Sequence, residues 1–168
     1  MNIGRWLALL IPHLIVTLPV AVLMAPIVAL FSTAKAREYF PWFVTWDNPI
    51  TGDVGHELRW LRKPKYVKKL TWLLRNRAYG FSSMVTGVKP WLNVKVNGDP
   101  LVGNRPLREG IVTRTTPDGT WQIYLVYKSF AGRCLRVNIG WKLWGDPSHP
   151  NFGQYTFAIN PFMGYSDA

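Results

Sequence analysis

The segment Trp6–Phe31, WLALLIPHLIVTLPVAVLMAPIVALF, runs for 26 residues without a formally charged side chain. As an α-helix it would extend about 39 Å at ~1.5 Å per residue, which exceeds the roughly 30 Å hydrocarbon core of a bilayer. A chain of 168 residues has little core in which to bury a helix that is apolar on every side. The segment therefore predicts an N-terminal transmembrane helix that anchors the protein.

A cleaved signal peptide is the alternative interpretation, because Ala34-Lys35-Ala36 resembles the small-x-small pattern before a cleavage site. Signal peptides have a shorter apolar run, of about 7–15 residues, and carry their positive charge in front of it. Here Lys35 and Arg37 follow the segment, whereas Arg5 alone precedes it. Length and flanking charge both favour a retained anchor.

Basic residues are concentrated after the segment, and this predicts the orientation of the anchor. Between residues 56 and 77, Glu57 alone opposes a cluster of Arg59, Arg62, Lys63, Lys65, Lys68, Lys69, Arg75 and Arg77. Cytoplasmic flanks of membrane helices are enriched in Lys and Arg. We therefore expect a single-pass protein whose C-terminal part lies in the cytoplasm. The single cysteine, Cys134, agrees, because one thiol cannot form a disulfide within the chain.

Prolines and alanines recur at regular spacing within the apolar segment. Pro12, Pro19 and Pro26 are seven residues apart, so they lie close to the same face of a helix. Ala21, Ala25 and Ala29 form a small-xxx-small ladder, which lets two membrane helices approach closely. Such ladders also arise by chance in Ala-rich segments, so we retain a homo-oligomer only as an alternative.

The charge pattern of residues 64–76 predicts a basic amphipathic helix that begins at Pro64. One face carries Tyr66, Val67, Leu70, Leu73 and Leu74. Such a helix, close behind a membrane span, is expected to lie in the plane of the headgroups. The predicted partner is therefore a bilayer with anionic headgroups. The residues expected to contact its surface are Lys63, Lys65, Lys68, Lys69, Trp72, Arg75 and Arg77.

Two alternatives remain open for these basic residues. The net charge of +11 is also typical of nucleic-acid-binding proteins, but no recognised nucleic-acid-binding motif accompanies it, so we disfavour nucleic acid as a partner. A helix that packs against the C-terminal domain is the purely structural interpretation. It is compatible with membrane contact.

The densest set of oxygen and nitrogen ligands lies in the loop Asp47–Glu57 and consists of Asp47, Asn48, Asp53, His56 and Glu57. Their spacing matches neither an EF-hand nor a zinc site. Asn-Pro and Gly-Asp pairs are equally typical of turns. We predict no metal site, and we retain an ion-binding or enzymatic loop as the alternative.

From about residue 91 the pattern changes to two-residue alternation interrupted by turn residues, which is typical of β-strands. The expected strands are 91–97, 111–116, 121–130, 134–144 and 154–159. They predict an antiparallel meander. The fold class is therefore α+β, with an anchor over residues 1–37, a juxtamembrane region over 38–88 and a β-rich domain over 89–168.

Motifs of enzymes are missing from the sequence. The chain has no Gly-rich phosphate loop, no G-x-S-x-G elbow and no H-E-x-x-H pair. Asp146 and His149 could act as a base and its orienting partner, but no nucleophile accompanies them. We predict no catalytic residue and no cofactor.

Several blocks of the sequence resemble a family of small, uncharacterised membrane proteins encoded by tailed bacteriophages and prophages. These blocks are the proline-containing apolar segment, Asp47-Asn48-Pro49 with Gly52-Asp53, Arg75–Phe81, Arg133–Leu143 and Asn160–Tyr165. The third block has Arg77 where the family pattern leads us to expect proline. The resemblance implies a phage-encoded protein at the inner membrane of a bacterial host, and it carries no activity.

The hypothesis for function is a non-enzymatic protein that tethers a cytoplasmic β-rich interaction module to the membrane. The module would offer a partner surface of Arg133, Arg136, Trp141, Lys142 and Trp144. The partner could be a host envelope component or another phage protein. A membrane-associated enzyme that uses the Asp47–Glu57 loop is the second hypothesis.

Overall fold

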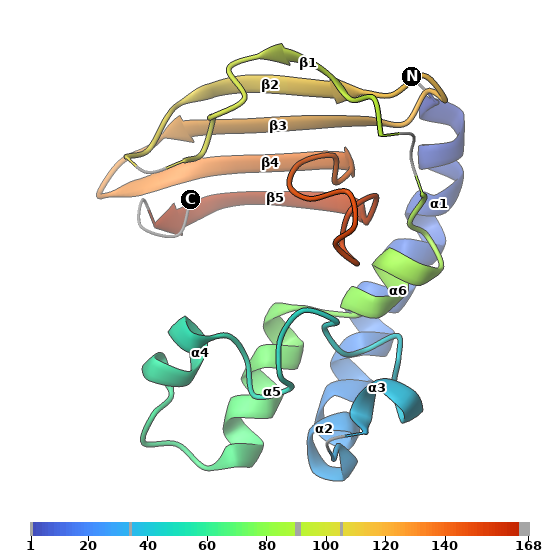
Figure 1. The fold of residues 1–168 in the computed structure, drawn as a ribbon. Helices are drawn as coiled ribbons and strands as arrows, with labels where there is room; N and C mark the ends of the chain where they lie inside the picture. The colour runs from blue at the N-terminus through green and yellow to red at the C-terminus, as the bar shows by residue number, and fades with distance from the viewer. Residues whose placement is uncertain (1, 34, 90–91, 105, 165–168) are drawn as a thin grey trace. The chain divides into compact units, whose positions relative to one another are not determined.

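Figure 1 shows the computed structural model, which describes residues 2–33, 35–89, 92–104 and 106–164. The expected α+β class is confirmed. The chain divides into two compact units. One comprises Met1–Trp6 and Val88–Ala168 and contains the sheet, and we call it the sheet unit. The other comprises Leu7–Gly87 and is helical, and we call it the helical unit.

The N-terminal apolar segment is helical from Ile3 to Phe31, over 29 residues. It consists of α1 (Ile3–Ile15), a π-helical stretch (Val16–Val20) and α2 (Ala21–Phe31). Pro19 lies in the π-helical stretch, where its missing N–H is accommodated by the altered hydrogen-bond pattern. Within the described residues, this is the one helix whose length and composition would allow it to cross a membrane.

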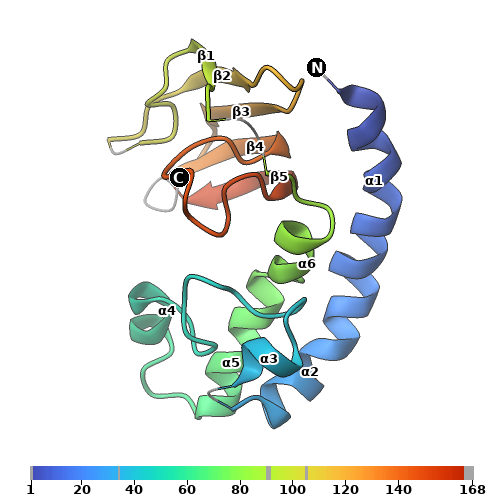
Figure 2. The same ribbon diagram turned by 45° about the vertical axis from the view of Figure 1, so that its right-hand side comes forward.

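In the helical unit, α2 packs against α5 (Lys65–Arg75), as Figures 1 and 2 show. Shorter helices complete the unit: α3 (Ala36–Tyr39), α4 (Val54–Arg59) and α6 (Tyr79–Met84). Its main core consists of Ala25, Val28, Ala29, Ala36, Val44 and Leu73. Ala21 packs with Ala78 and Phe81. The alanine ladder is therefore filled by side chains of the same chain.

Helix α5 agrees closely with the helix expected over residues 64–76. Pro64 precedes its first residue with an extended backbone, and Asn76 follows its last. The chain then turns through Ala78, whose φ of +47° is left-handed. Leu70 and Leu73 of the predicted apolar face of α5 pack in the core that contains Ala25, Val28 and Ala29 of α2, whereas Tyr66 and Leu74 are exposed.

The sheet contains five antiparallel strands in the order β1-β2-β3-β4-β5, which confirms the meander. Their bounds are β1 Lys95–Gly98, β2 Gly110–Thr115, β3 Trp121–Lys128, β4 Arg133–Trp141 and β5 Tyr155–Gly164. Strand β1 is shorter than expected, and Trp91, the start of the expected strand, lies outside the described residues.

Three strands end two or more residues from the expected position. Strand β3 ends at Lys128 instead of residue 130. Strand β4 ends at Trp141 instead of residue 144, because the backbone N–H of Leu143 donates to the Gln122 side chain (3.1 Å). Strand β5 continues past Ile159 to Gly164 and includes Pro161. Proline is tolerated there because β5 is an edge strand, where an N–H can point away from the ladder.

The two faces of the sheet are covered by different parts of the sheet unit. On one face, Val112, Tyr124, Val126 and Cys134 form a core with Val102. Leu107, Trp144 and Met163 pack against this core.

The other face meets the first residues of α1. The Trp6 ring stacks on Tyr155 with centroids 5.6 Å apart, and the Tyr155 hydroxyl donates to the Trp6 carbonyl (2.9 Å). Beyond this contact, Ile111, Phe157 and Ile159 are exposed on the same face.

Gly140 is required by close packing within β4, and we predict that Gly140→Ala destabilises the sheet unit. Its φ is +111°, and an added Cβ would lie 2.2 Å from the Trp121 carbonyl oxygen of the neighbouring strand. Strain and overpacking together should cost about 3 kcal/mol. Urea unfolding of the full chain in neutral detergent, followed by tryptophan fluorescence, measures the loss.

Gly132→Ala is the matched control. Gly132 also has a positive φ (+68°), but nothing lies within 4 Å of its added Cβ. The control should lose about 1 kcal/mol from backbone strain alone. Equal losses for the two variants would contradict the role given to Gly140.

Candidate membrane-attachment site and binding surface

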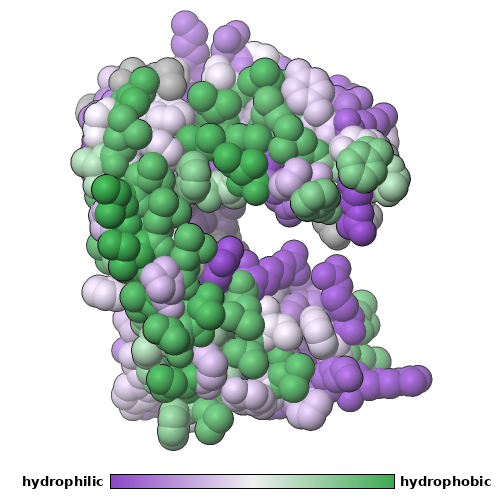
Figure 3. Space-filling model, turned by 180° about the vertical axis from the view of Figure 1, so that it is seen from behind, coloured by the Kyte–Doolittle hydropathy of each residue, from purple (hydrophilic) through white to green (hydrophobic). Residues whose placement is uncertain are grey.

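The exposed side of the N-terminal helix is apolar from Leu7 to Phe31. The large exposed side chains are Ile3, Leu7, Ile11, Ile15, Leu18, Val22, Leu23, Ile27, Leu30 and Phe31. Figure 3 shows hydrophobic side chains gathered along this helix. The polar side chains His13 and Thr17 are buried, and the Thr17 hydroxyl donates to the His13 carbonyl (2.8 Å). A continuous apolar surface of this length is unfavourable in water and marks a site of contact with lipid or protein.

The predicted membrane-surface residues separate into two groups. Lys63, Lys65, Arg75 and Arg77 are exposed and are free to meet anionic groups. The remaining three, Lys68, Lys69 and Trp72, hold the helical unit together. Their partners are provided by other parts of that unit.

Lys68 binds the Glu57 carboxylate at 2.9 Å, and Lys69 donates to the Ser32 carbonyl at 2.5 Å. Burial lowers the pKa of Lys69, and the nearby Lys65 charge adds to this effect. Trp72 is buried, and its indole N–H donates to the Thr45 hydroxyl (3.1 Å). These three side chains therefore cannot contact lipid without giving up interactions inside the unit.

The structure shows an apolar and basic surface on α4 and the turn after it. The sequence analysis did not identify the apolar residues of this surface. Val54, Leu58 and Leu61 are between 65% and 76% exposed on α4 and the turn after it. Arg59, Arg62 and Lys63 are exposed beside them in the sequence. We call these six residues the α4 tip. The spacing of the apolar residues, four and then three positions apart, is the signal that could have found it.

The polar residues of the loop Asp47–Glu57 have structural partners. Asp53 caps α4 by accepting a hydrogen bond from the His56 backbone N–H (2.7 Å). The buried His56 ring lies 3.0 Å from the Lys68 carbonyl. Hydrogen bonds from Thr51 and Lys68 lower the pKa of Glu57. In the described part of the chain, no group of three or more His, Cys, Asp or Glu side chains could hold a metal ion.

The Asp146 and His149 side chains lie in a loop and form local turns. The Asp146 carboxylate accepts hydrogen bonds from the Ser148 N–H and hydroxyl, both at 2.8 Å. These bonds lower the pKa of Asp146. The His149 ring accepts from the Asn151 N–H (3.3 Å). Both side chains therefore stabilise turns within the loop between β4 and β5.

The predicted partner-surface residues do not share one surface. Trp141 is buried beside Trp121 and Tyr155. Arg133 is exposed, and its guanidinium donates to the Phe162 carbonyl (3.2 Å). Arg136, Lys142 and Trp144 come together in a different place. Lys142 Nζ lies 5.5 Å from the centre of the Trp144 ring.

Arg136 and Trp144 line a cavity of about 360 Å³ within the sheet unit, which we call the sheet pocket. Its other lining residues are Pro100, Val102, Gly103, Asn104, Arg114 and Tyr124. Arg114 and Tyr124 were not identified from the sequence. They come from β2 and β3, so only the pairing of the strands reveals that they lie near Arg136 on β4.

The sheet pocket is electrostatically positive. Burial lowers the pKa of the Arg114 guanidinium, but arginine stays protonated in proteins. Burial also raises the pKa of the Tyr124 hydroxyl, against the opposing effect of Arg136. Tyr124 therefore keeps its proton at neutral pH and remains a hydrogen-bond donor.

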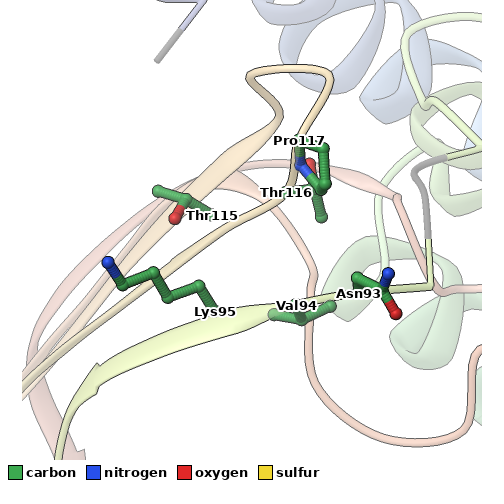
Figure 4. Close-up of a pocket in the computed structure, with 6 residues that line it drawn as sticks. All are labelled: Asn93, Val94, Lys95, Thr115, Thr116 and Pro117. Atoms are coloured by element: carbon green, nitrogen blue, oxygen red, sulfur yellow. The ribbon is translucent and has the colours of Figure 1, made fainter.

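A second cavity, of about 550 Å³, lies beside β1 and β2 and is lined by Asn93, Val94, Lys95, Thr115, Thr116 and Pro117 (Figure 4). Lys95 is its one charged lining residue. Figure 4 shows the tips of the Lys95 and Asn93 side chains well apart. The cavity therefore lacks polar groups that converge on one point.

The fold and these surfaces define the class of the protein: an α+β protein with a membrane-length apolar helix and an antiparallel five-stranded sheet. The chain matches a family of unknown function, DUF7338, over residues 1–167, and it belongs to this family. No curated protein and no solved structure gives a match.

The structural role of Asp53 gives a testable prediction. Asp53→Ala should lower the free energy of unfolding by about 1 kcal/mol, because the cap of α4 is lost. Asp53→Asn should retain most of the stability, since asparagine caps helices equally well. Urea unfolding of the full chain in detergent measures both changes. Stabilisation of the wild type by Ca²⁺ or Zn²⁺, abolished equally by both variants, would instead indicate an ion site.

Proposed function

We propose that this protein is a non-enzymatic, membrane-attached protein that presents a β-rich interaction module at the membrane surface. The observation that carries the proposal is the N-terminal helix, whose exposed residues from Leu7 to Phe31 are all apolar. Burying each large aliphatic side chain in lipid is worth about 1.5–3 kcal/mol. The exposed apolar side of this helix is therefore the strongest driving force for attachment on the molecule.

The basic residues of the helical unit support attachment to an anionic surface. Lys65, Arg75 and Arg77 are exposed, and the α4 tip combines Arg59, Arg62 and Lys63 with apolar side chains. Each cation near an anionic leaflet contributes about 1 kcal/mol. Apolar side chains flanked by cations suit the boundary between headgroups and acyl chains.

The proposed location is the inner membrane of a bacterial host, with the β-rich module in the cytoplasm. The basic residues after the apolar helix support this orientation, and the resemblance to phage-encoded membrane proteins supports the host. The proposed partner of the module is a protein of the host envelope or of the phage.

The form of attachment is constrained by the first residues of the chain. In a single-pass protein, residues 2–6 lie across the bilayer from the residues that follow Phe31. In the structure, however, the Asn2 N–H donates to the Gly119 carbonyl (2.8 Å), and Trp6 packs on Tyr155. A spanning helix would break these contacts, whereas a helix embedded along one leaflet keeps them. The contacts therefore favour embedding in one leaflet.

An enzymatic role for the Asp47–Glu57 loop has less support. Asp53, His56 and Glu57 are engaged in a helix cap, a contact with a backbone carbonyl and an ion pair. A nucleic-acid role would require binding that weakens steeply with salt and needs no lipid.

The attachment is tested by placing charges on the exposed side of α1. Ile11→Lys with Ile15→Lys should move most of the protein out of carbonate-washed membranes, because each change replaces an aliphatic side chain, whose burial in lipid is worth about 1.5–3 kcal/mol, with a charge. Leu92→Lys with Phe130→Lys is the matched control, since both residues are 72% exposed in the sheet unit. A washed membrane fraction that retains the α1 double variant would contradict the proposal.

The form of attachment is tested with an epitope tag before Met1 and a second tag after Ala168. Protease digestion of intact spheroplasts and of inverted vesicles reports the side of each tag. Embedding in one leaflet predicts that both tags are cut only in inverted vesicles. Cleavage of the N-terminal tag in intact spheroplasts, with the C-terminal tag protected, would establish the single-pass form.

A further inference from the structure

We propose that the sheet pocket binds the phosphate group of a phosphate ester, held by Arg114, Arg136 and Tyr124. This inference rests on the proposed function and deepens it, because it names the chemistry that the β-rich module recognises. Arg114, Arg136, Tyr124 and Asn104 all line one cavity, so side chains that carry donors of several geometries border it.

The register of the sheet brings these side chains to one face. Arg114 pairs with Gln122, Tyr124 pairs with both Val112 and Asn138, and Val126 pairs with Arg136. Because side chains alternate between faces along a strand, Arg114, Tyr124 and Arg136 all point to the same side. The loop between β1 and β2 supplies Asn104 to the pocket.

Arg114 is the strongest evidence for a ligand. It is only 6% exposed, and its Nη2 donates to the Pro100 carbonyl (3.2 Å). Its Nη1 is buried and has no hydrogen-bond partner among the residues that the structure describes. The guanidinium also lies 5.6 Å from the centre of the Trp144 ring. A buried cationic donor without a hydrogen bond costs free energy, and an anion in the pocket would remove this cost.

The charges of the pocket are not balanced by carboxylates. Among the lining residues that the structure describes, none is acidic. Asp99, next to the lining residue Pro100, pairs with Arg108 at 3.3 Å. In the described part of the chain, neither Arg114 nor Arg136 forms an ion pair. The Arg136 guanidinium lies 5.2 Å from the Tyr124 ring centre and reaches the weak acceptor Met163 Sδ at 3.5 Å.

Phosphate fits this donor set better than a carboxylate does. One guanidinium engages both oxygens of a carboxylate in a single plane, whereas the terminal oxygens of a phosphate ester can accept from several donors in three dimensions. The cavity volume of about 360 Å³ exceeds what a phosphate group alone needs, so there is room for part of the esterified group.

The test measures binding of inorganic phosphate and of glycerol 3-phosphate to the full chain in neutral detergent, by isothermal titration calorimetry. Wild type should bind, and Arg136→Gln should weaken binding about tenfold or more, because a charge-assisted hydrogen bond is lost. Asn104→Asp is a second variant at an exposed rim position, where it cannot disturb the core. It should also weaken binding, by repulsion.

Lys95→Gln is the matched control, because it removes one positive charge from the sheet unit away from the pocket. Lys95 pairs with Thr115 and therefore lies on the face opposite Arg114. The control should bind phosphate within twofold of wild type. Absent phosphate binding, binding unaffected by both pocket variants, or equal weakening by Lys95→Gln would overturn the inference.

A competition experiment distinguishes a lipid headgroup from a soluble phosphate ester as the ligand. Vesicles of phosphatidylcholine with phosphatidic acid should displace glycerol 3-phosphate if the ligand is a lipid headgroup, and should not if it is a soluble ester. In both cases, Arg136→Gln should weaken binding of glycerol 3-phosphate. Flotation with pure phosphatidylcholine vesicles reports attachment separately. Flotation without phosphate binding overturns this inference alone, whereas phosphate binding without flotation overturns the proposed attachment.

Discussion

The structure depends on the N-terminal helix, whose two sides differ in composition and in burial. One side carries small and polar residues, including Thr17, Ala21 and Ala25, which are covered by the protein itself. The small side chains let α2 approach α5 closely, so Ala25, Val28 and Leu73 share one core. The other side carries the large aliphatic residues and has no cover in the described chain. This division makes the helix a core element on one side and, in the proposed function, the attachment surface on the other.

The same division explains why the basic cluster is not a uniform surface. Helix α5 has to pack on α2, so side chains near that contact are drawn into the unit. Lys69 reaches the Ser32 carbonyl beyond the end of α2, and Lys68 is neutralised by Glu57. The cations that remain exposed are those at the ends of α5 and on the α4 tip. The number of basic residues in the cluster is therefore larger than the number that an anionic surface can contact.

The sequence predicted the elements whose evidence is local. Helix α5 was found because Pro64 and a 3.6-residue pattern mark it, and the strands were found from alternation and turn residues. The sequence could not predict which side of α5 is covered, since the partner of Trp72 is Thr45, far away in the chain. The sheet pocket was missed for a related reason. Arg114, Tyr124 and Arg136 become neighbours only through strand register, which alternation alone does not determine.

The contacts of the first residues link attachment to the binding module. Trp6 lies against Trp121, Tyr155 and Phe157 of the sheet and contributes its carbonyl to a buried hydrogen bond. The next residues of the same helix, from Leu7, expose apolar side chains that favour lipid. Under the proposed attachment, Leu7 lies in lipid directly after Trp6, so the chain itself tethers the sheet unit to the membrane. Tethering raises the local concentration of membrane-bound partners, so modest affinity in the sheet pocket would suffice for binding.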